Sequence, residues 1–403
     1  MEVIFLLSIK GVNLQIEEHL ILGLFLVLFL GIKGLFKRIQ IAPVVGFLLF
    51  GWGVRLFDER FLFITPKIAL FLENLSKIGL ILLLFQIGLE AHVKKLLTLL
   101  PKVWLIALGN VIFSILPCIF VSLFFGFSLN ASLFIALVLL ATSIAVSAAA
   151  LRKGELAESK TGALMLDLSL IDDLAAIFFM ILLFHGLNEE PFYSLALPVF
   201  LLTLALFALF CYLFSSFIEP LLMQKLIRYE KMPDSMISVI GMGLIIASIA
   251  ALLNFSLAIG AFFAGMAFSR DPKAVKMDAS MQAIFDFFIP FFFFYVGYRI
   301  SLPAMEGSWL FFMAILGAAI LGKLIGNYYP ARWSHLSVHT SLLIAVSRLP
   351  RAEASIIVLD FASQKQVLSQ GVYSALSLTI LFTSLLTPFG VRLVRRLKPL
   401  SSV

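Results

Sequence analysis

The chain has 403 residues, of which 62% are hydrophobic and only 13% are charged. Ordinary soluble domains are roughly 45 to 50% apolar and roughly 25% charged, so the composition excludes a purely soluble protein. The formal net charge of +7 does not indicate a nucleic-acid partner, because the basic residues occupy short segments between apolar blocks and form no extended patch. Cys118 and Cys211 lie inside apolar runs, which predicts neither a disulfide nor a metal site.

The apolar blocks, taken in chain order, are long enough to cross a membrane. A hydrocarbon core about 30 Å thick requires roughly 20 helical residues. The continuous runs lack the two-residue alternation of a barrel strand, so we expect an all-α polytopic membrane protein with about 13 transmembrane helices, in a single membrane domain over 1–403. The predicted spans lie near 20–36, 41–57, 68–90, 101–125, 130–150, 159–184, 194–217, 233–252, 256–269, 280–298, 307–330, 338–360 and 370–394.

The basic residues between the spans predict the topology. The loops on one side of the membrane hold 20 lysines and arginines, and those on the other side hold six. Cytoplasmic loops carry the excess of such residues. We therefore expect a multi-pass protein of the cell inner (plasma) membrane, with its C-terminus in the cytoplasm and its N-terminus outside. The first segment does not have the pattern of a cleaved secretory signal.

The fifth and twelfth spans are richer in small and polar residues than a lipid-facing helix. The fifth runs into ATSIAVSAAALRKGE (141–155), and the twelfth contains AVSRLPRAEASIIV (345–358). Pro350 is expected to break the twelfth helix, and freed backbone groups are tolerated at that depth only inside protein or beside a water-filled cavity. The two segments lie seven spans apart and so cross the membrane in opposite directions. This position and composition predict inverted repeats with two interrupted, crossing helices, as in secondary transporters.

The sixth span, LMLDLSLIDDLAAIFFMILL, carries the adjacent aspartates Asp172 and Asp173 inside an apolar helix. One aspartate at the centre of a membrane helix costs roughly 2.5 to 3.5 kcal/mol. The pair therefore predicts a water-filled cavity, a positive partner or a functional proton. The alternative, a helix-end pair at the interface, is disfavoured by the apolar run 174–184 that follows. Adjacent helical positions point about 100° apart, so the two carboxylates are expected to differ in role.

Lys323, in the middle of the eleventh span AILGAAILGKLIGNYY, is the candidate ion-pair partner for one aspartate. The alternative is a side chain that reaches the interface. Burial disfavours the charged forms of both carboxylates and amines, so such a site can exchange protons near working pH. A carboxylate that holds a proton cannot also bind a monovalent cation well, which predicts exchange. Thr142 and Ser143 are candidate cation ligands, although buried hydroxyls often bond to helix backbone.

Three charged residues, Arg348, Arg351 and Glu353, flank Pro350 in the twelfth span. We expect them to neutralise one another and the exposed helix ends, in a structural or gating role. Glu90 ends the third span, where an interfacial position is favoured over a role in transport. The five histidines fall at span ends or in loops, so nothing indicates an enzyme, and no selectivity-filter segment indicates a channel.

Seven segments in order resemble the bacterial monovalent cation:proton antiporters, in the paired-aspartate sodium/proton exchanger branch of the cation:proton antiporter-2 family. The aspartate segment LSLIDDLAAI (168–177) resembles the ion-binding helix of that family. The other segments are LLLFQIGLEAHVKKL (82–96), ATSIAVSAAALRKGEL (141–156), SLAIGAFFAGMAFS (256–269), IPFFFFYVGYRISL (289–302), LGKLIGN (321–327) and LPRAEASIIV (349–358).

The resemblance implies a secondary active antiporter that exchanges sodium or lithium for protons by alternating access and serves pH homeostasis. Potassium:proton exchange on the same scaffold is the alternative. Asp173 is implied as the principal cation and proton site, Asp172 as its partner, and Lys323 as the lysine that pairs with an aspartate. Besides the transported ions, no cofactor is implied. The expected partners are membrane lipid and a second copy in a homodimer, with no nucleic acid or soluble partner.

The resemblance also divides the membrane domain. An ion-translocation core is implied near 101–184 and 307–394, and a dimerisation part near 37–90 and 194–298. Tyr298 and Arg299 stand where a small residue and then an acidic one are usual, and Ala352 stands where glycine is frequent, so gating or selectivity is expected to differ. The sequence ends at Val403, and no soluble regulatory domain of the nucleotide-sensing kind is expected.

Overall fold

The protein is helical throughout the part that the computed structural model describes. This part comprises residues 14–39, 41–62, 64–90, 93–143, 146–147, 160–186, 196–218, 221–222, 225, 235–253, 255–269, 279–351 and 353–397. Fourteen α-helices and no strand occur in these ranges. The all-α class predicted from the continuous apolar runs is therefore confirmed.

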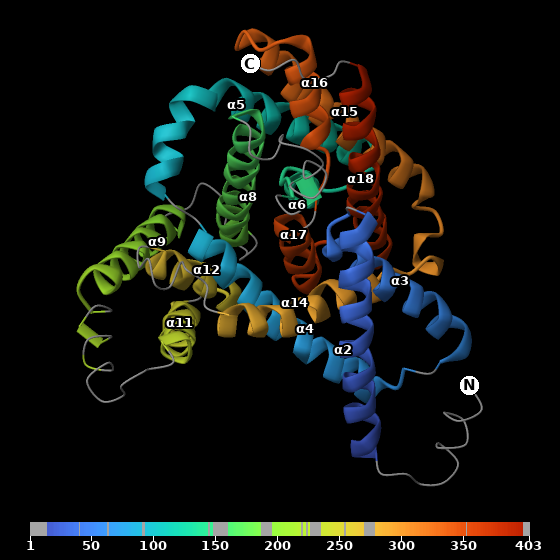
Figure 1. The fold of residues 1–403 in the computed structure, drawn as a ribbon, viewed down its shortest axis with the longest axis vertical. Coiled ribbons are helices and arrows are strands. Elements are labelled where there is room, and N and C mark those ends of the chain that lie inside the picture. The colour runs from blue at the N-terminus through green and yellow to red at the C-terminus, as the bar shows by residue number, and fades with distance from the viewer. Residues whose placement is uncertain are drawn as a thin grey trace.

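Figure 1 shows the helices coloured in chain order from blue to red. The first half contains α2 (Leu14–Ile39), α3 (Pro43–Phe61), α4 (Pro66–Glu90), α5 (Val93–Phe124), α6 (Leu129–Val138), α8 (Lys160–Gly186) and α9 (Ala196–Leu213), which continues into a π-helical turn, η1 (Phe214–Ile218). The second half contains α11 (Ser235–Leu252), α12 (Leu257–Phe268), α14 (Ala279–Tyr298), the 3₁₀ turn η2 (Pro303–Met305), α15 (Trp309–Trp333), α16 (Val338–Ser347), α17 (Glu353–Gln364) and α18 (Gln370–Leu397).

Six of the described helices are long and apolar enough to cross a membrane by themselves. Five further apolar helices or helix segments are shorter, with 10 to 17 residues. Short apolar helices are expected where a span is interrupted or packs inside the protein rather than against lipid. The helices confirm a polytopic membrane protein, while the total of 13 spans stays a prediction.

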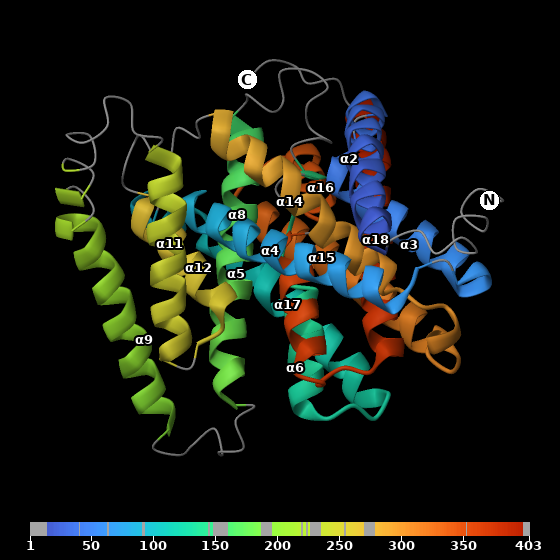
Figure 2. The ribbon, with the colours of Figure 1, turned by 90° about the horizontal axis from the view of Figure 1, so that it is seen from below.

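The helices form two groups that contact mainly their own members. One group consists of α5, α6, α8, α15, α16, α17 and α18, and the other consists of α3, α4, α11, α12 and α14, with α2 packed on α3 and α9 packed on α12. In both ribbon views α4 and α14 lie side by side in the middle of the molecule, with α9 and α11 at one edge (Figures 1 and 2). A contact between α3 and α18 joins the groups.

The short helices α6 and α16 are equivalent elements of the two halves. Each has 10 residues and follows a serine N-cap, Ser128 or Ser337, whose hydroxyl accepts a backbone N–H. The segments SLNASLFIALVLLAT (128–142) and SVHTSLLIAVSRLPR (337–351) share both serines of a Ser-x-x-x-Ser pattern, followed by Leu, Ile-Ala and Leu at matching positions. The inverted repeat, predicted from position and composition, thus also has a sequence signature.

Both equivalent helices end inside the protein. The predicted fifth span 130–150 is interrupted, since α6 ends at Val138 and residues 141–143 are not helical before Val146 and Ser147 resume a helix. The rest of that span lies outside the described residues. In the twelfth span, α16 and α17 are separated around Pro350. Proline removes a backbone donor and clashes with the preceding turn, so the break occurs where the sequence predicts it.

Glycines allow the helix pair α5 and α15 to pack at very short range. A Cβ atom on Gly322 would lie 2.1 Å from the backbone oxygen of Phe113, and one on Gly326 would lie 2.6 Å from that of Gly109. A backbone oxygen cannot move aside as a flexible side chain can. Small residues permit this close approach in membrane helices, and here they hold Lys323, on the same helix as Gly322, in a fixed place relative to α5.

Candidate ion-binding site

The candidate site lies where the C-terminal ends of α6 and α16 meet in the middle of their helix group. The backbone N–H of Ser143 donates to the carbonyl of Pro350 at 2.9 Å, which joins the two interrupted segments directly. The last carbonyls of a helix lack intrahelical donors and carry a partial negative charge. Two such ends meeting inside an apolar protein favour cations, and three cationic side chains lie here: Lys323, Arg348 and Arg351.

Asp172, on α8, is the carboxylate that contacts the cations. Its Oδ2 accepts a hydrogen bond from the hydroxyl of Thr142 at 2.6 Å and a hydrogen bond from Nη2 of Arg348, and Nζ of Lys323 lies 3.4 Å away. The side chain of Asp172 is 1% exposed. A buried charge is tolerated when it is paired and hydrogen-bonded, and Asp172 has two positive partners.

Asp173 has a different environment, as the angular spacing of neighbouring helical residues predicts. Its Oδ1 accepts the backbone N–H of Thr142 at 3.3 Å. The residue is 4% exposed, against 1% for Asp172. Of the two adjacent aspartates, Asp173 thus has the weaker set of described donors and the greater exposure, so its oxygens are the more available to an ion.

Lys323, on α15, is completely buried, so the alternative of a side chain reaching the interface is wrong. Its Nζ donates to the carbonyl of Leu140 at 2.5 Å and to the hydroxyl of Thr142 at 2.6 Å. Thr142 therefore accepts from the lysine and donates to Asp172, linking the two. One turn further along α15, the side-chain amide of Asn327 donates to the Lys323 carbonyl at 2.8 Å. It also donates to the side-chain oxygen of Asn110 on α5 at 3.0 Å.

Arg351 binds backbone carbonyls. Its guanidinium donates to the carbonyls of Leu139 at 2.9 Å, Leu349 at 3.0 Å and Ala319 at 2.9 Å. These carbonyls come from the end of α6, the segment after α16, and α15. Arginine has five N–H donors in a fixed plane, so one side chain binds carbonyls of three segments and holds the break together.

Glu353 begins α17 and accepts a hydrogen bond from the hydroxyl of Ser143 at 2.8 Å. The N-terminus of a helix favours a negative side chain. Among the described contacts, Arg348, Arg351 and Glu353 bind other groups and do not pair with one another, contrary to the mutual neutralisation expected. Arg351 does bind exposed helix-end carbonyls, as expected. Glu90 is exposed at the end of α4, where it accepts a hydrogen bond from Gln86.

Comparison with known proteins identifies the fold and the family. A family model described as sodium/hydrogen exchanger, transmembrane, matches residues 24–395. The chain belongs to the sodium/hydrogen exchanger family. This family membership agrees with the resemblance of the seven ordered segments and makes the chain a multi-pass membrane protein of a transporter family.

Two curated relatives and one solved structure illustrate the similarity of this exchanger-family chain. A Na⁺/H⁺ antiporter of Enterococcus hirae is 28% identical over 353 residues, which cover 87% of this chain and 91% of the relative. The Na⁺/H⁺-K⁺ antiporter GerN of Bacillus cereus is 26% identical over 345 residues, covering 81% and 85%. The structure of the sodium proton antiporter MjNhaP1 from Methanocaldococcus jannaschii has the same fold, with a TM-score of 0.68, 15% identity, and coverage of 94% and 96%.

Tyr298 and Arg299, two positions where the sequence predicts a departure from the resembled family, join the helix groups at the end of α14. The hydroxyl of Tyr298 donates to Asp58 of α3 at 2.6 Å. The next residue, Arg299, forms an ion pair with Asp360 of α17 at 2.8 Å, and its guanidinium lies 4.3 Å from the ring centroid of Tyr373. Adjacent residues thus bind opposite groups of helices. The third predicted departure, Ala352, lies outside the described residues.

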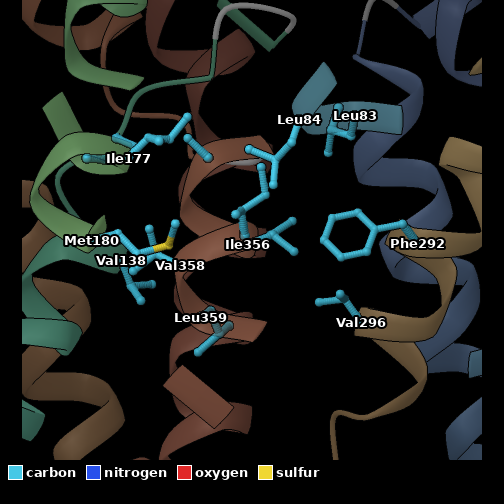
Figure 3. Packing of buried hydrophobic residues seen from close by; sticks show 14 of the residues in the cluster. Leu83, Leu84, Val138, Ile177, Met180, Phe292, Val296, Ile356, Val358 and Leu359 are labelled. Atoms are coloured by element: carbon cyan, nitrogen blue, oxygen red, sulfur yellow. The ribbon is translucent and has the colours of Figure 1, made fainter. Parts of the chain in front are cut away.

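A cavity of about 500 Å³ lies between the two helix groups, at the end where α17 finishes. Its walls include Leu84, Ser256, Phe361, Gln364 and Lys365. Figure 3 shows the packing beside it, where side chains of α17 such as Ile356 and Val358 lie between those of α8 and those of α4 and α14. Asp173 is not among the lining residues. The aspartates thus lie outside the cavity lining, and the buried side chains of Figure 3 form an apolar layer next to the cavity.

The site contains two relationships that the sequence pattern did not predict. One is the contact between Arg348 and Asp172, which are 176 positions apart. The other is the amide pair of Asn110 and Asn327, which connects α5 to α15. In each case the sequence shows only a single polar or charged residue in an apolar span. Such a residue is a candidate for a functional role, but the sequence does not show which residue it contacts.

Proposed function

We propose that this chain is a secondary active antiporter that exchanges a monovalent cation, sodium or lithium, for protons by alternating access, and so contributes to pH homeostasis. The single observation that carries the proposal is the buried cluster around Asp172 and Asp173 at the crossing of two interrupted helices. Family membership supports it, because the relatives compared above are named as antiporters.

The cluster supports exchange by competition at one site. A carboxylate oxygen of Asp173 accepts a hydrogen bond from the backbone N–H of Thr142. Asp173 is also adjacent to Asp172, which pairs with the fully buried Lys323. A carboxylate is a hard oxygen ligand suited to sodium or lithium when ionised, and it loses that ability when protonated. An ion and a proton therefore exclude each other, and a proton gradient drives the cation when only occupied sites change sides.

We assign Asp173 as the principal cation and proton site and Lys323 as its coupling partner through Asp172. Thr142 and Ser143 remain candidate ligands through backbone or hydroxyl oxygens, although their described hydroxyl contacts are with Asp172, Lys323 and Glu353. Potassium is the alternative cation, since GerN is named as a Na⁺/H⁺-K⁺ antiporter.

We also propose that the two helix groups are functional units. The group that contains α5, α6, α8 and α15 to α18 is the moving core, and the group around α3, α4, α12 and α14 is the dimerisation part of a homodimer. The separation of their contacts supports this division. The protein is proposed to lie in the plasma membrane with its C-terminus in the cytoplasm, because of the 20 to six distribution of basic residues.

The decisive experiment uses purified protein in vesicles loaded at a set pH, with an internal pH indicator. Sodium, lithium, potassium and choline chlorides are added separately across a range of pH. Proton movement with sodium or lithium, but not with choline, is expected. Movement with potassium alone would replace sodium by potassium in the proposal, and no movement with any of the three cations would refute antiport.

A further inference from the structure

The pairing of Asp172 with two cations raises the question of which cation fixes its charge. Lys323 Nζ is 3.4 Å from Asp172 Oδ2, and it lies closer to the Leu140 carbonyl and the Thr142 hydroxyl, at 2.5 and 2.6 Å. Arg348 donates directly to the same carboxylate oxygen through Nη2. Both cationic side chains are 0% exposed. The arginine is therefore the closer of the two cationic partners of Asp172.

The backbone does not require an arginine at this position. Arg348 is the C-cap residue of α16, with φ −97° and ψ 8°, and the equivalent C-cap residue of α6 is Leu139, with φ −97° and ψ 0°. A leucine thus ends the matching helix with the same geometry. The neighbouring Arg351, not Arg348, binds the carbonyls of Leu139 and Leu349 at the ends of α6 and α16. Neither the backbone conformation nor the capping of α16 therefore explains why an arginine occupies position 348.

The charged groups around the aspartate pair come from each element packed against it. They are Asp173 on α8 itself, Lys323 on α15, Arg348 and Arg351 in the segment after α16, and Glu353 in the first turn of α17. Of the three cations, arginine remains protonated under all conditions that proteins meet, whereas a lysine amine can give up its proton. If Lys323 were the only partner, its deprotonation would leave Asp172 buried without a counter-charge, which is costly.

We propose that Arg348 is a positioning residue that keeps Asp172 as a fixed, permanently paired counter-charge, so that Lys323 and Asp173 are free to exchange protons. This inference rests on the proposed antiport function and specifies how its site is organised. Nε and Nη1 of Arg348 and Oδ1 of Asp172 have no hydrogen-bond partner among the described residues. These two donors and this acceptor are available for further hydrogen bonds. Arg348 and Asp172 can therefore stay paired when neighbouring groups change charge.

The test is a double-mutant cycle with Arg348→Gln, Asp172→Asn and the double variant. Sodium-dependent proton movement in vesicles is measured across pH, together with sodium-induced thermal stabilisation of the purified protein, which requires binding but no turnover. Arg348→Gln removes a positive charge, so the remaining groups hold protons more tightly. We expect its pH profile to move in the alkaline direction by about one unit or more, a tenfold change in the proton equilibrium.

The cycle separates an effect through Asp172 from a general loss of structure. In the Asp172→Asn background, Arg348→Gln is expected to move the pH dependence of sodium stabilisation by much less than in the native background. Arg348→Lys should restore the native profile only where the new amine is protonated, and should depart from it at alkaline pH, where a lysine can lose its proton. Arg332→Gln, an exposed arginine at the cytoplasmic end of α15, is the matched control and should leave the profile in place.

Two results would overturn the inference while the antiport function stands. One is an equal shift by Arg348→Gln in both backgrounds. The other result concerns the case in which Arg348→Gln fails to fold. The double variant should then be more stable than Arg348→Gln, because Asp172→Asn removes the unpaired carboxylate. A double variant that is no more stable would overturn the inference. Absence of cation-dependent proton movement in the native protein would instead refute the proposed function.

Discussion

At the scale of single residues, Asp173 is the clearest target because its carboxylate has one described donor, the backbone N–H of Thr142 at 3.3 Å. Replacing it by asparagine keeps the shape and removes the titratable oxygen. We predict that Asp173→Asn abolishes cation-dependent proton movement in vesicles. Folding should persist, because the backbone N–H retains an oxygen acceptor in the asparagine amide.

The control for this variant is Asp286→Asn, a substitution of a partly exposed aspartate paired with Lys33. Exposed ion pairs contribute little to stability, so this change should leave exchange near the native rate. Full exchange activity in Asp173→Asn would remove that residue from the site. Size-exclusion chromatography and thermal unfolding establish that both variants are folded.

Lys323 carries the second residue-scale prediction. In Lys323→Ala the Leu140 carbonyl and the Thr142 hydroxyl lose their donor, and Asp172 loses one of two cations. Because Arg348 still pairs with Asp172, exchange should survive at a reduced rate. The loss of positive charge should move its pH profile in the alkaline direction.

The matched control is Lys77→Ala, which removes an exposed lysine from the spanning helix α4. Its pH profile should coincide with that of the native protein. A Lys323→Ala profile that also coincides with the native one would exclude the lysine from coupling. The measurement is the rate of sodium-dependent proton movement at a series of pH values.

The residue scale also shows what the sequence could reveal about the site. Asp172, Asp173 and Lys323 stand out because ionisable groups are rare in apolar spans, and the structure places the aspartates at the helix crossing and Lys323 against Asp172. The partner of Arg348 did not stand out. A broken helix can point its last side chain in many directions, and only the packing of α16 on α8 selects Asp172.

At the scale of elements, the close packing of α5 against α15 gives a stability prediction. Gly322→Ala would place a Cβ 2.1 Å from the Phe113 carbonyl oxygen, so the helices must separate. Overpacking of this kind costs about 1 to 3 kcal/mol. We predict a lower unfolding temperature and, because Lys323 is adjacent, slower exchange.

Gly317→Ala is the control on the same helix, since a Cβ there meets nothing within 4 Å. Alanine exceeds glycine in helix propensity by about 1 kcal/mol, so this variant should be as stable as the native protein or more so. Equal unfolding temperatures for the two variants would contradict the prediction, because they would show that α5 and α15 can separate at little cost in stability.

Elements were predicted more completely than their contacts. Apolar runs identify the helices because a spanning backbone must satisfy its own polar groups, and Pro350 identifies the break before α17. The end of α6 at Val138 was less visible, because no proline marks it and the predicted span continued to 150. The glycine contacts were not predicted, since a glycine in a helix reveals a close approach only when the facing backbone is known.

At the scale of the whole molecule, the cavity between the helix groups predicts access from one side of the membrane. Phe361 lines the cavity, whereas Ile356, on the same helix, is completely buried. In a background with Cys118 and Cys211 replaced by alanine, Phe361→Cys should react with a membrane-impermeant thiol reagent added outside intact cells. Ile356→Cys should not react.

This labelling experiment tests the orientation as well as the cavity. Reaction of Phe361→Cys only in inverted vesicles would reverse the proposed topology. Equal reaction of both cysteines would show that the apolar layer of Figure 3 opens readily to water. Mass spectrometry of the labelled protein measures both rates.

The equivalence of α6 and α16 has a historical meaning. Two arms with the same cap, length and backbone angles but opposite directions are what the copying of one ancestral segment leaves behind. The copies have diverged at their tips, where one ends in Leu139 and the other in Arg348. The guanidinium that binds Asp172 is therefore present in one copy and absent from the other.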